Sequence, residues 1–337
     1  MVTSPLFIVI LAAGKGTRMK SEKAKVLHEV FYEPMASHVL ESTLPLQPKR
    51  TVVVIGHQKE EVKKALSSFN CEFAIQQEQL GTGHAVLAAE SIFNGEQATV
   101  MILCGDTPLI RKETLEHIYS FHLDGKNDLT LLTTILDDPT NYGRVLSDDS
   151  GNLLGIVEQK DASESELAIQ EINAGIYCVD SAFLFSALKK VGTDNKQGEV
   201  YLTDIVGSAV EAGLTVKKYT TPDPIEVLGV NSRLELSEAQ RELQHRRNLD
   251  LMSTGVSMIG PESIRVCPES TVMNDTLLES GVHIYGGSFI GSSCLIEQGT
   301  VLKNCTLGDN VQIGAGSHLE NEVIGDNQTV PPLSKTI

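Results

Sequence analysis

One feature constrains the fold of this chain more than any other: an aliphatic residue recurs every six positions near its C-terminus. The series starts at Val272 and, with a step of five at two places, continues through Leu278, Ile284, Ile290, Ile296, Leu302, Leu307, Ile313, Leu319, Ile324 and Val330. A period of six is typical of a left-handed parallel β-helix, in which each hexad forms one side of a triangular prism and the aliphatic side chain fills its axis. Three hexads make a coil, so the sequence predicts fewer than four coils, with Gly, Asn and Asp at the corners.

The N-terminal part has a different pattern, that of strands buried on both faces. The run from Leu6 to Ala13 is continuously apolar, too short for a membrane span and without the positive leader of a signal peptide. Similar runs occupy Thr51 to Gly56 and Ala98 to Ile110, each after a stretch compatible with a helix. This alternation predicts an α/β domain with a Rossmann-like mixed sheet and helices on both faces.

The first strand ends in a glycine-rich, basic turn. Its spacing does not fit a Walker loop, and Met19 stands where a dinucleotide fingerprint needs its third glycine. The glycines and basic side chains of residues 14–18, with lysines downstream at 20, 23 and 25, favour a phosphate cradle. A tight turn with solvated lysines is the alternative on this segment alone.

A carboxylate follows a second strand at the same predicted edge of the sheet. Asp106 comes directly after "MILCG", and ligands of open α/β sheets bind at the carboxyl ends of the strands. Beside a phosphate cradle, its oxygens are suited to Mg²⁺, whereas in isolation a Gly-Asp pair after a strand is a turn.

Charge and cysteine content exclude several classes of protein. The chain has 337 residues, with 44 acidic and 27 basic side chains and a net charge of -17, which repels nucleic acid and anionic membranes. Its six cysteines form no CxxC pair and no cluster with metal-ligand spacing. We therefore expect a cytoplasmic protein with neither a disulfide framework nor a zinc site.

Several segments together resemble one family. In order and spacing they are similar to the uridyltransferase domain of bacterial N-acetylglucosamine-1-phosphate uridyltransferases, from about residue 6 to residue 236. The matching segments are "LAAGKGTRM" with Lys25, "QQEQLGTGHA", "CGDTPLI", "DDPTNYGRV", "GIVEQKDA", "EINAGIY", "QGEVYLTDIV" and "VLGVNSRLEL". The resemblance implies transfer of uridylyl from UTP to N-acetyl-α-D-glucosamine 1-phosphate, with Mg²⁺ as cofactor, for the synthesis of peptidoglycan and lipopolysaccharide precursors.

The resemblance also implies a role for each matching position. Arg18, Lys25 and Asp106 would be catalytic, and Asp106 with Asn231 would ligate Mg²⁺. The nucleotide would contact Leu11, Ala12, Ala13, Gly14, Gln76, Gly81 and Thr82, and the amino sugar would contact Gly143, Glu158, Asn173 and Asn231.

Four positions depart from the family pattern. Ala24 replaces the usual proline, Cys104 a frequent tyrosine, Ala174 a threonine and Leu228 a glutamate. Two alternatives to the implied activity stay open: a non-catalytic regulatory homologue that binds a sugar nucleotide, and a uridyltransferase for another hexose 1-phosphate.

The domain organisation follows from these patterns. We expect a nucleotidyltransferase domain over 1–232, a connecting helix over 233–255 and a truncated β-helix domain over 256–337. In the helix, Leu234, Leu236, Ala239 and Leu243 have roughly helical spacing. In the family, later coils carry an acetyltransferase, so we expect no such activity here, with His283 and His318 as surface residues. Flat prism faces predict a homotrimer.

Overall fold

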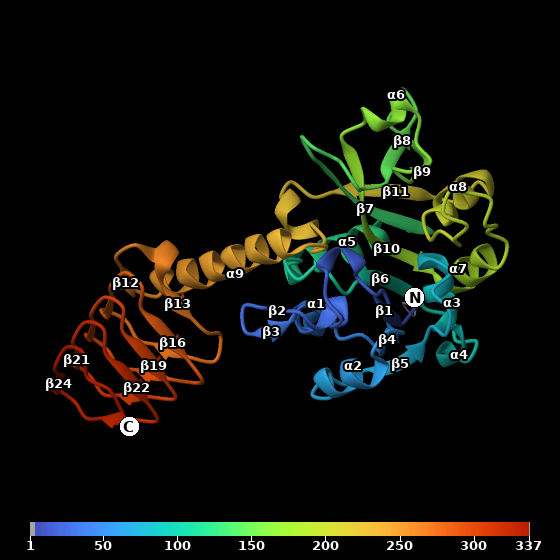
Figure 1. The fold of residues 1–337 in the computed structure, drawn as a ribbon. Helices are drawn as coiled ribbons and strands as arrows, with labels where there is room; N and C mark the ends of the chain where they lie inside the picture. Colours follow the sequence, from blue (N-terminus) through green and yellow to red (C-terminus); the bar gives the residue numbers. More distant parts are fainter. Residues whose placement is uncertain (1–3, 337) are drawn as a thin grey trace. The chain divides into compact units, whose positions relative to one another are not determined.

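The computed structural model describes residues 4–336 and divides the chain into two compact units, Met1–Leu236 and Ser237–Ile337 (Figure 1). Each unit has its own hydrophobic core: two clusters in the first, one in the second. Both predicted fold classes are confirmed: a Rossmann-like α/β domain with a mixed sheet, and a left-handed parallel β-helix.

The first unit is built on a mixed, nine-stranded sheet. Its main path runs in the order β11 (Val216–Thr220), β7 (Leu129–Ile135), β10 (Glu171–Asp180), β6 (Thr99–Cys104), β1 (Leu6–Ala12), β4 (Arg50–Ile55) and β5 (Glu72–Ile75). The hairpin of β8 (Arg144–Ser147) and β9 (Leu153–Val157) joins through β10. The strands from β6 to β5 are parallel, whereas β10 is antiparallel to both of its neighbours.

Helices cover both faces of this sheet, as the continuous apolar runs predict. Along β1, Phe7 and Val9 point into one core, and Ile8 and Ile10 into the other. The first core includes residues of α3 (Thr82–Ala88), α4 (Glu90–Phe93), α7 (Ser181–Leu188) and α8 (Asp204–Glu211). The second includes residues of α1 (Met35–Thr43), α2 (Lys59–Ala65) and α5 (Lys112–Asp124).

Short elements fill the connections. They are the 3₁₀ turns Thr17–Met19, Lys25–Leu27, Leu44–Leu46 and Pro224–Val227, the hairpin β2 (Glu29–Val30) and β3 (Glu33–Pro34), and α6 (Glu164–Leu167). The strand register then brings two of the loops together. Leu11 pairs with Cys104, and the Gly105 N–H donates to the Leu11 carbonyl at 2.9 Å. The loops after β1 and β6 therefore begin side by side.

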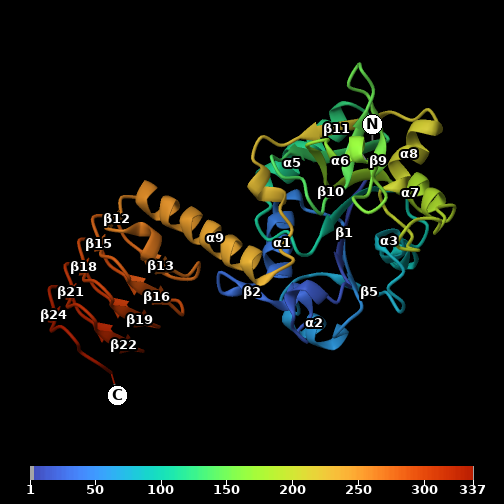
Figure 2. The same cartoon turned by 45° about the horizontal axis from the view of Figure 1, so that its top comes forward.

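The second unit is a prism with three parallel sheets. Figure 2 shows its coils stacked along one axis. One sheet contains β12 (Ser257–Met258), β15 (Leu277–Leu278), β18 (Leu295–Ile296), β21 (Gln312–Ile313) and β24 (Thr329–Val330). Another contains β13 (Arg265–Val266), β16 (His283–Tyr285), β19 (Val301–Lys303) and β22 (His318–Glu320). The third contains β14 (Thr271–Val272), β17 (Phe289–Ile290), β20 (Thr306–Leu307) and β23 (Val323–Ile324).

The period-six residues fill the prism as predicted, and the segment that they mark, from β14 to β24, forms fewer than four coils as expected, although the whole prism is longer. The aliphatic members from Val272 to Leu319 are buried, and Ile324 and Val330 pack against the same core. The three sheets contain five, four and four strands, which is more than four coils. The strands β12 and β13 precede Val272: Val266 of β13 lies six residues before it and extends the pattern, whereas a step of eight separates Val266 from Met258 of β12.

The prism corners use the predicted small residues. Asn304, Asn310, Asn321 and Asn327 all have positive φ, a conformation that Asn adopts more readily than most residues. At other corner positions, side chains cap the next coil: the Thr276 hydroxyl donates to the Gly291 carbonyl at 2.8 Å. The corners thus satisfy backbone groups that a tight bend leaves unpaired.

The connecting helix α9 spans Arg233–Ser253, and its buried residues are Ala239, Gln244, Asn248 and Leu251. Leu234 is 68 % exposed, whereas Gln244 and Asn248 are buried. The Asn248 side chain donates to the Pro261 carbonyl at 2.8 Å and to the Ile264 carbonyl at 3.0 Å. Hydrogen bonds from amide side chains, which hydrophobic periodicity does not detect, therefore fix this helix to the start of the prism.

Candidate active site

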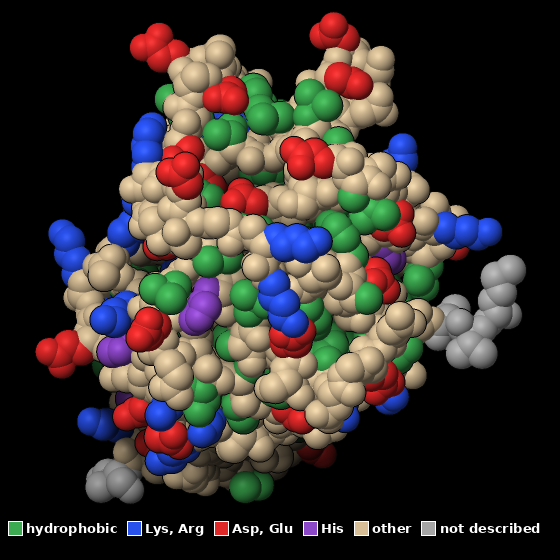
Figure 3. Space-filling model, turned by 90° about the vertical axis from the view of Figure 1, so that its right-hand side faces the viewer, with side chains coloured by type: hydrophobic (Ala, Val, Ile, Leu, Met, Phe, Trp, Pro, Cys, Tyr) green, Lys and Arg blue, Asp and Glu red, His purple; other side chains and the backbone are tan. Residues whose placement is uncertain are grey.

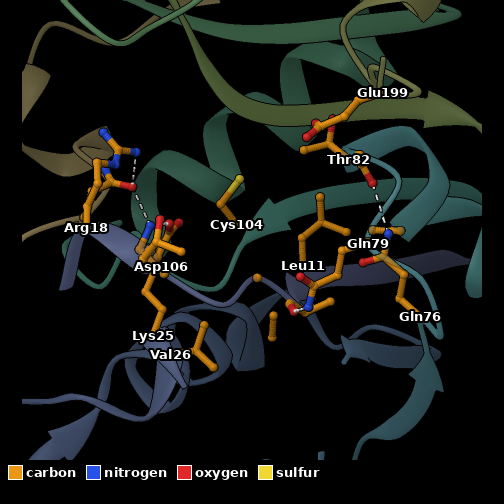
Figure 4. A pocket seen from close by; sticks show the side chains of 18 residues that line it. Leu11, Arg18, Lys25, Val26, Gln76, Gln79, Thr82, Cys104, Asp106 and Glu199 are labelled. Carbon is orange, nitrogen blue, oxygen red and sulfur yellow. Dashed lines mark hydrogen bonds and ion pairs between the residues drawn. The ribbon is translucent and has the colours of Figure 1, made fainter. Parts of the chain in front are cut away.

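A cavity of about 450 Å³ lies at the carboxyl ends of β1 and β6 (Figure 4). Eleven of the fourteen site residues that the sequence predicts line it. They are Leu11, Ala12, Ala13, Gly14, Arg18, Lys25, Gln76, Gly81, Thr82, Asp106 and Asn231. The loop after β1, the 3₁₀ turns that follow it and the loop after β6 supply most of its positive end.

The glycine turn brings Lys25 into this cavity by a close backbone approach. Gly16 has φ +65°, and a Cβ there would lie 2.6 Å from the Cβ of Lys25. Only glycine therefore allows the two segments to meet. Lys25 is 9 % exposed and follows Ala24, whose N–H donates to Gln58 Oε1 at 2.6 Å. A proline at position 24, which the resemblance described above would lead us to expect, could not make this bond.

Two cationic and two oxygen-bearing side chains form one network. Lys25 Nζ forms an ion pair with Asp106 and donates to Asn231 Oδ1 at 2.5 Å. Arg18 Nη2 donates to the same Asn231 oxygen at 2.7 Å. The carboxylate and the amide oxygen thus converge on a cationic group, the ammonium of Lys25. Because Mg²⁺ prefers carboxylate and amide oxygens, this pair of donors fits a divalent cation.

Tertiary structure alone brings Asp106 and Asn231 together, since 125 positions separate them. The Val230 N–H donates to the Asp106 carbonyl at 2.8 Å, which ties the two loops at the backbone. Asn231 Nδ2 donates to the Gly229 carbonyl at 2.9 Å. This bond fixes the orientation of the amide and leaves Oδ1 directed at Lys25 and Arg18.

Cys104, at the end of β6, lies in the cavity between its two ends (Figure 4). Burial, reinforced by the charge of Asp106, raises the pKa of its thiol to about 12. The raised pKa favours the neutral thiol, which is a weaker nucleophile than the thiolate.

The other end of the cavity is uncharged except for one carboxylate. Gln76 Nε2 donates to the Gly81 carbonyl at 3.1 Å. Gly81 has φ +108°, and a Cβ there would lie 2.5 Å from the Val200 carbonyl oxygen, so the segment requires glycine. Thr82 Oγ1 accepts from the Leu202 N–H at 3.0 Å. These bonds hold the residues that we expected to contact the uracil.

Sequence reasoning assigned no role to two polar residues of this end, Gln79 and Glu199 (Figure 4). Gln79 Nε2 donates to the Ala13 carbonyl at 2.7 Å, so it links the base end to the turn after β1. Both residues lie within segments that resemble the family. Their position in those segments was the available signal, because neither stands next to a recognisable turn or strand end.

The three remaining sugar residues, Gly143, Glu158 and Asn173, lie outside this cavity but close to each other. The Asn173 N–H donates to the Gly143 carbonyl at 2.9 Å, and a Cβ on Gly143 would lie 3.7 Å from Glu158 Cδ. Glu158 Oε1 accepts from Thr203 Oγ1 at 3.2 Å, and burial raises the pKa of its carboxyl. Glu158 lines a second cavity of about 350 Å³.

The candidate cation site consists of one Asp and one Asn and, among the residues that the structure describes, contains no cluster of His, Cys or acidic ligands. Within residues 4–336 no group of three or more His, Cys, Asp or Glu side chains is arranged to hold a metal.

On the face shown in Figure 3, acidic and basic side chains are interspersed. None of the helices in the described part of the chain has both the length and the apolar character of a membrane span.

Comparison with known proteins gives two kinds of match. The family model of the MobA-like NTP transferase domain matches residues 8–145. The bifunctional protein GlmU of Desulfotalea psychrophila is 51 % identical over 328 residues, which cover 97 % of this chain and 97 % of that protein. GlmU proteins of Lactobacillus delbrueckii subsp. bulgaricus and Shouchella clausii are each 43 % identical over 97 % of this chain, covering 71 % and 72 % of their own length.

Proposed function

Because the chain belongs to the family of bifunctional GlmU proteins, we propose that it transfers uridylyl from UTP to N-acetyl-α-D-glucosamine 1-phosphate and releases pyrophosphate. The enzyme class is that of a nucleotidyltransferase. The observation that supports the proposal best is the convergence of Arg18, Lys25, Asp106 and Asn231 at one end of a cavity whose other end is uncharged apart from Glu199. A nucleoside triphosphate is divided in a complementary way, with anionic phosphates at one end and an uncharged base at the other.

The phosphates would bind at the end formed by the turn after β1. The backbone of Leu11 to Gly14 lines the cavity there, and Lys25 and Arg18 supply positive charge. In an in-line displacement, an oxygen of the sugar phosphate attacks the α-phosphorus of UTP and pyrophosphate leaves. Lys25 and Arg18 would stabilise the negative charge that develops on the phosphoryl oxygens.

Asp106 and Asn231 would hold Mg²⁺, as their convergence on a cationic group supports. When bound, the ion would neutralise phosphate charge and orient the reacting groups. Lys25 would then redirect its ammonium from these two residues towards the phosphates.

Gln76 would select uracil over cytosine. Its Nε2 is engaged by the Gly81 carbonyl, so its Oε1 is the atom that we assign to the uracil N3–H. Cytosine has an acceptor at that ring position and would leave the amide oxygen unpaired.

Gly143, Glu158 and Asn173 would bind the amino sugar. Their mutual contacts bring a half-buried carboxylate and a backbone turn into one cluster. Glu158 can accept hydrogen bonds from sugar hydroxyls. The departures Ala174 and Leu228 flank assigned positions, so another hexose 1-phosphate is the alternative substrate to be tested.

We also propose that residues 256–330 assemble a homotrimer. The outward positions of the β14 sheet, which pair in one ladder, are Thr271, Phe289, Thr306 and Val323. They are uncharged, and Phe289 and Val323 are 42 % and 79 % exposed. Burial of this face against another copy would remove apolar surface from water. Phe289→Asp should give monomers in light scattering, whereas Thr329→Asp on another face should not; an unchanged oligomer would contradict the face chosen.

The prism itself is proposed to have no glucosamine-1-phosphate acetyltransferase activity. Its interior is aliphatic, His283 stacks on Tyr285 with ring centroids 4.7 Å apart, and His318 is exposed. Release of thiol from acetyl-CoA that depends on glucosamine 1-phosphate would overturn this. We place the enzyme in the cytoplasm, where its product supplies cell-wall precursor synthesis.

One experiment tests the main proposal. The purified chain is incubated with Mg²⁺, each of UTP and CTP, and a panel of sugar 1-phosphates, and pyrophosphate release is measured. UTP with N-acetylglucosamine 1-phosphate should give the highest rate. Binding of UDP-N-acetylglucosamine without turnover would indicate the regulatory homologue, and preference for glucose 1-phosphate would indicate the other sugar.

A further inference from the structure

One side chain connects the cluster of sugar residues to the loop that contains Asn231. The Gly229 N–H donates to the hydroxyl oxygen of Tyr142 at 3.2 Å, across 87 positions of sequence. Tyr142 directly precedes Gly143, and Gly229 lies two residues before Asn231. The hydroxyl therefore joins the loop of Gly143, which we assign to the sugar, to the loop of Asn231, which we assign to the cation as well as to the sugar.

On the sugar side, the backbone around Tyr142 is firmly held. Arg144, which is buried, donates to the Tyr142 carbonyl. The Asn141 N–H donates to Gln159 Oε1 at 2.7 Å, and Arg144 Nη2 donates to the same oxygen at 3.2 Å. Because these bonds fix the main chain, the Tyr142 ring projects its hydroxyl from a rigid base.

On the Asn231 side, both backbone polar groups of Gly229 form hydrogen bonds. Its N–H donates to Tyr142, and its carbonyl accepts from Asn231 Nδ2 at 2.9 Å. The next residue, Val230, is bonded to the Asp106 carbonyl. A shift of Gly229 would therefore rotate the Asn231 amide relative to Asp106 and change how its oxygen faces the cation.

We propose that Tyr142 is a positioning residue that fixes the 229–231 loop against the sugar loop, and so couples binding of the sugar to binding of the cation. This inference rests on the proposed function. A sugar that orders its loop also orders Asn231 through the Tyr142 hydroxyl, and so strengthens binding of the cation. Because such coupling is reciprocal, the cation strengthens binding of the sugar by the same factor.

Tyr142→Phe removes this one bond and keeps the ring. The probe is UDP-N-acetylglucosamine, whose affinity is measured by calorimetry with excess Mg²⁺ and again with EDTA. The ratio of the two affinities is the coupling, and we expect the variant to lower it about fivefold to tenfold, the scale of one lost hydrogen bond with a partner left unpaired. Affinity in EDTA should change little.

Tyr219→Phe is the matched control. Tyr219 is half-buried on β11 and packs on Phe121 with centroids 5.5 Å apart, so it tests the loss of a hydroxyl elsewhere in the same unit. Its coupling ratio should equal that of the unmodified chain. The melting temperature of each variant shows whether the fold is retained.

A second arm asks whether Tyr142 acts through Asn231. In an Asn231→Ala background, Tyr142→Phe should have no further effect on the coupling. Equal loss of affinity in Mg²⁺ and in EDTA, additive effects in the double variant, or an unchanged ratio would each overturn the inference. If the unmodified chain does not bind UDP-N-acetylglucosamine at all, the proposed function fails instead.

Discussion

The two units of this molecule encode their structures in opposite ways. In the prism, strands pair with strands one coil away, and side-chain bonds join residues 17 or 18 positions apart. In the nucleotidyltransferase unit, the bond between Arg18 and Asn231 spans 213 positions. The prism thus repeats the same contacts between neighbouring coils, whereas the candidate active site depends on a few long-range contacts, each of which occurs once.

This difference predicts different responses to substitution. A repeated structure distributes its stability over many equivalent positions, so one change weakens it without affecting a distant reaction. A site assembled from single contacts loses its chemistry with one side chain while the fold persists. Four predictions test this contrast.

The largest effect is expected from Asp106→Asn, which keeps the shape of the side chain and removes its charge. The rate of pyrophosphate release should fall about a hundredfold or more, equivalent to about 3 kcal/mol of transition-state stabilisation. Asn231→Ala should act in the same direction but more weakly, because water can replace a neutral ligand. Added Mg²⁺ should restore part of the rate. Near-normal turnover at limiting Mg²⁺ would contradict the role of Asp106 as a metal ligand and indicate that it only forms the turn after β6.

In the prism, Ile296→Ala should instead affect stability alone. Ile296 is fully buried between the coils, so its truncation should cost about 3 kcal/mol of unfolding free energy in the second unit. Val330→Ala, in a partly buried position, is the matched control and should cost less. Hydrogen exchange over residues 257–330 measures the effect. A parallel loss of turnover in Ile296→Ala would show that the two units are not independent.

Acid should weaken the first unit through His122, a buried residue of α5. Burial lowers its pKa from 6.5 to about 4, and its Nδ1 lies 2.9 Å from Thr130 Oγ1. Between these values the unfolded chain binds the extra proton, so the free energy of unfolding falls as the pH is lowered from 6.5 towards 4, by roughly 2 kcal/mol at pH 5.

His122→Asn should flatten this pH dependence, which urea unfolding at a series of pH values would measure. The slope, not the absolute stability, is the readout, since the substitution also changes packing. An equal slope in the variant would assign the acid sensitivity to other groups.

The smallest effect is expected from Gln76→Ala at the base end of the cavity. It should lower kcat/KM for UTP about tenfold and leave the poor value for CTP almost unchanged, because only uracil would use the amide oxygen. Rates with both nucleotides check this. Equal losses for UTP and CTP would show that Gln76 supports the cavity without selecting the base.

Much of the fold could be predicted where its determinants are local. The continuous apolar runs identified β1, β4 and β6, and the six-residue period identified the interior of the prism from Val272 onwards. The prediction missed β12, which a step of eight separates from β13, and β13, although its Val266 fits the six-residue spacing; it also gave no role to Gln244 and Asn248, whose amide hydrogen bonds hold α9.

The candidate site was predicted unevenly for the same reason. The turn at Gly14 to Arg18 and the carboxylate at Asp106 follow buried strands, so their place at the sheet edge could be deduced from the strands themselves. The roles of Gln76, Glu158 and Asn231 came from the family resemblance alone. Gln79 and Tyr142 received no role, because their importance lies in hydrogen bonds to Ala13 and Gly229 that no local pattern marks.

The sequence by itself therefore determined that β1, β4 and β6 are strands buried on both faces and that the prism keeps its register from Val272 onwards, since hydrophobic burial follows the period of the chain. Only the tertiary structure decided that Lys25 lies between Asp106 and Asn231, and that Gly143, Glu158 and Asn173 form a cluster outside the main cavity. These contacts form because single glycines and backbone hydrogen bonds, as at Gly16 and Val230, bring the loops close together. Such loop contacts do not recur with any period in the sequence.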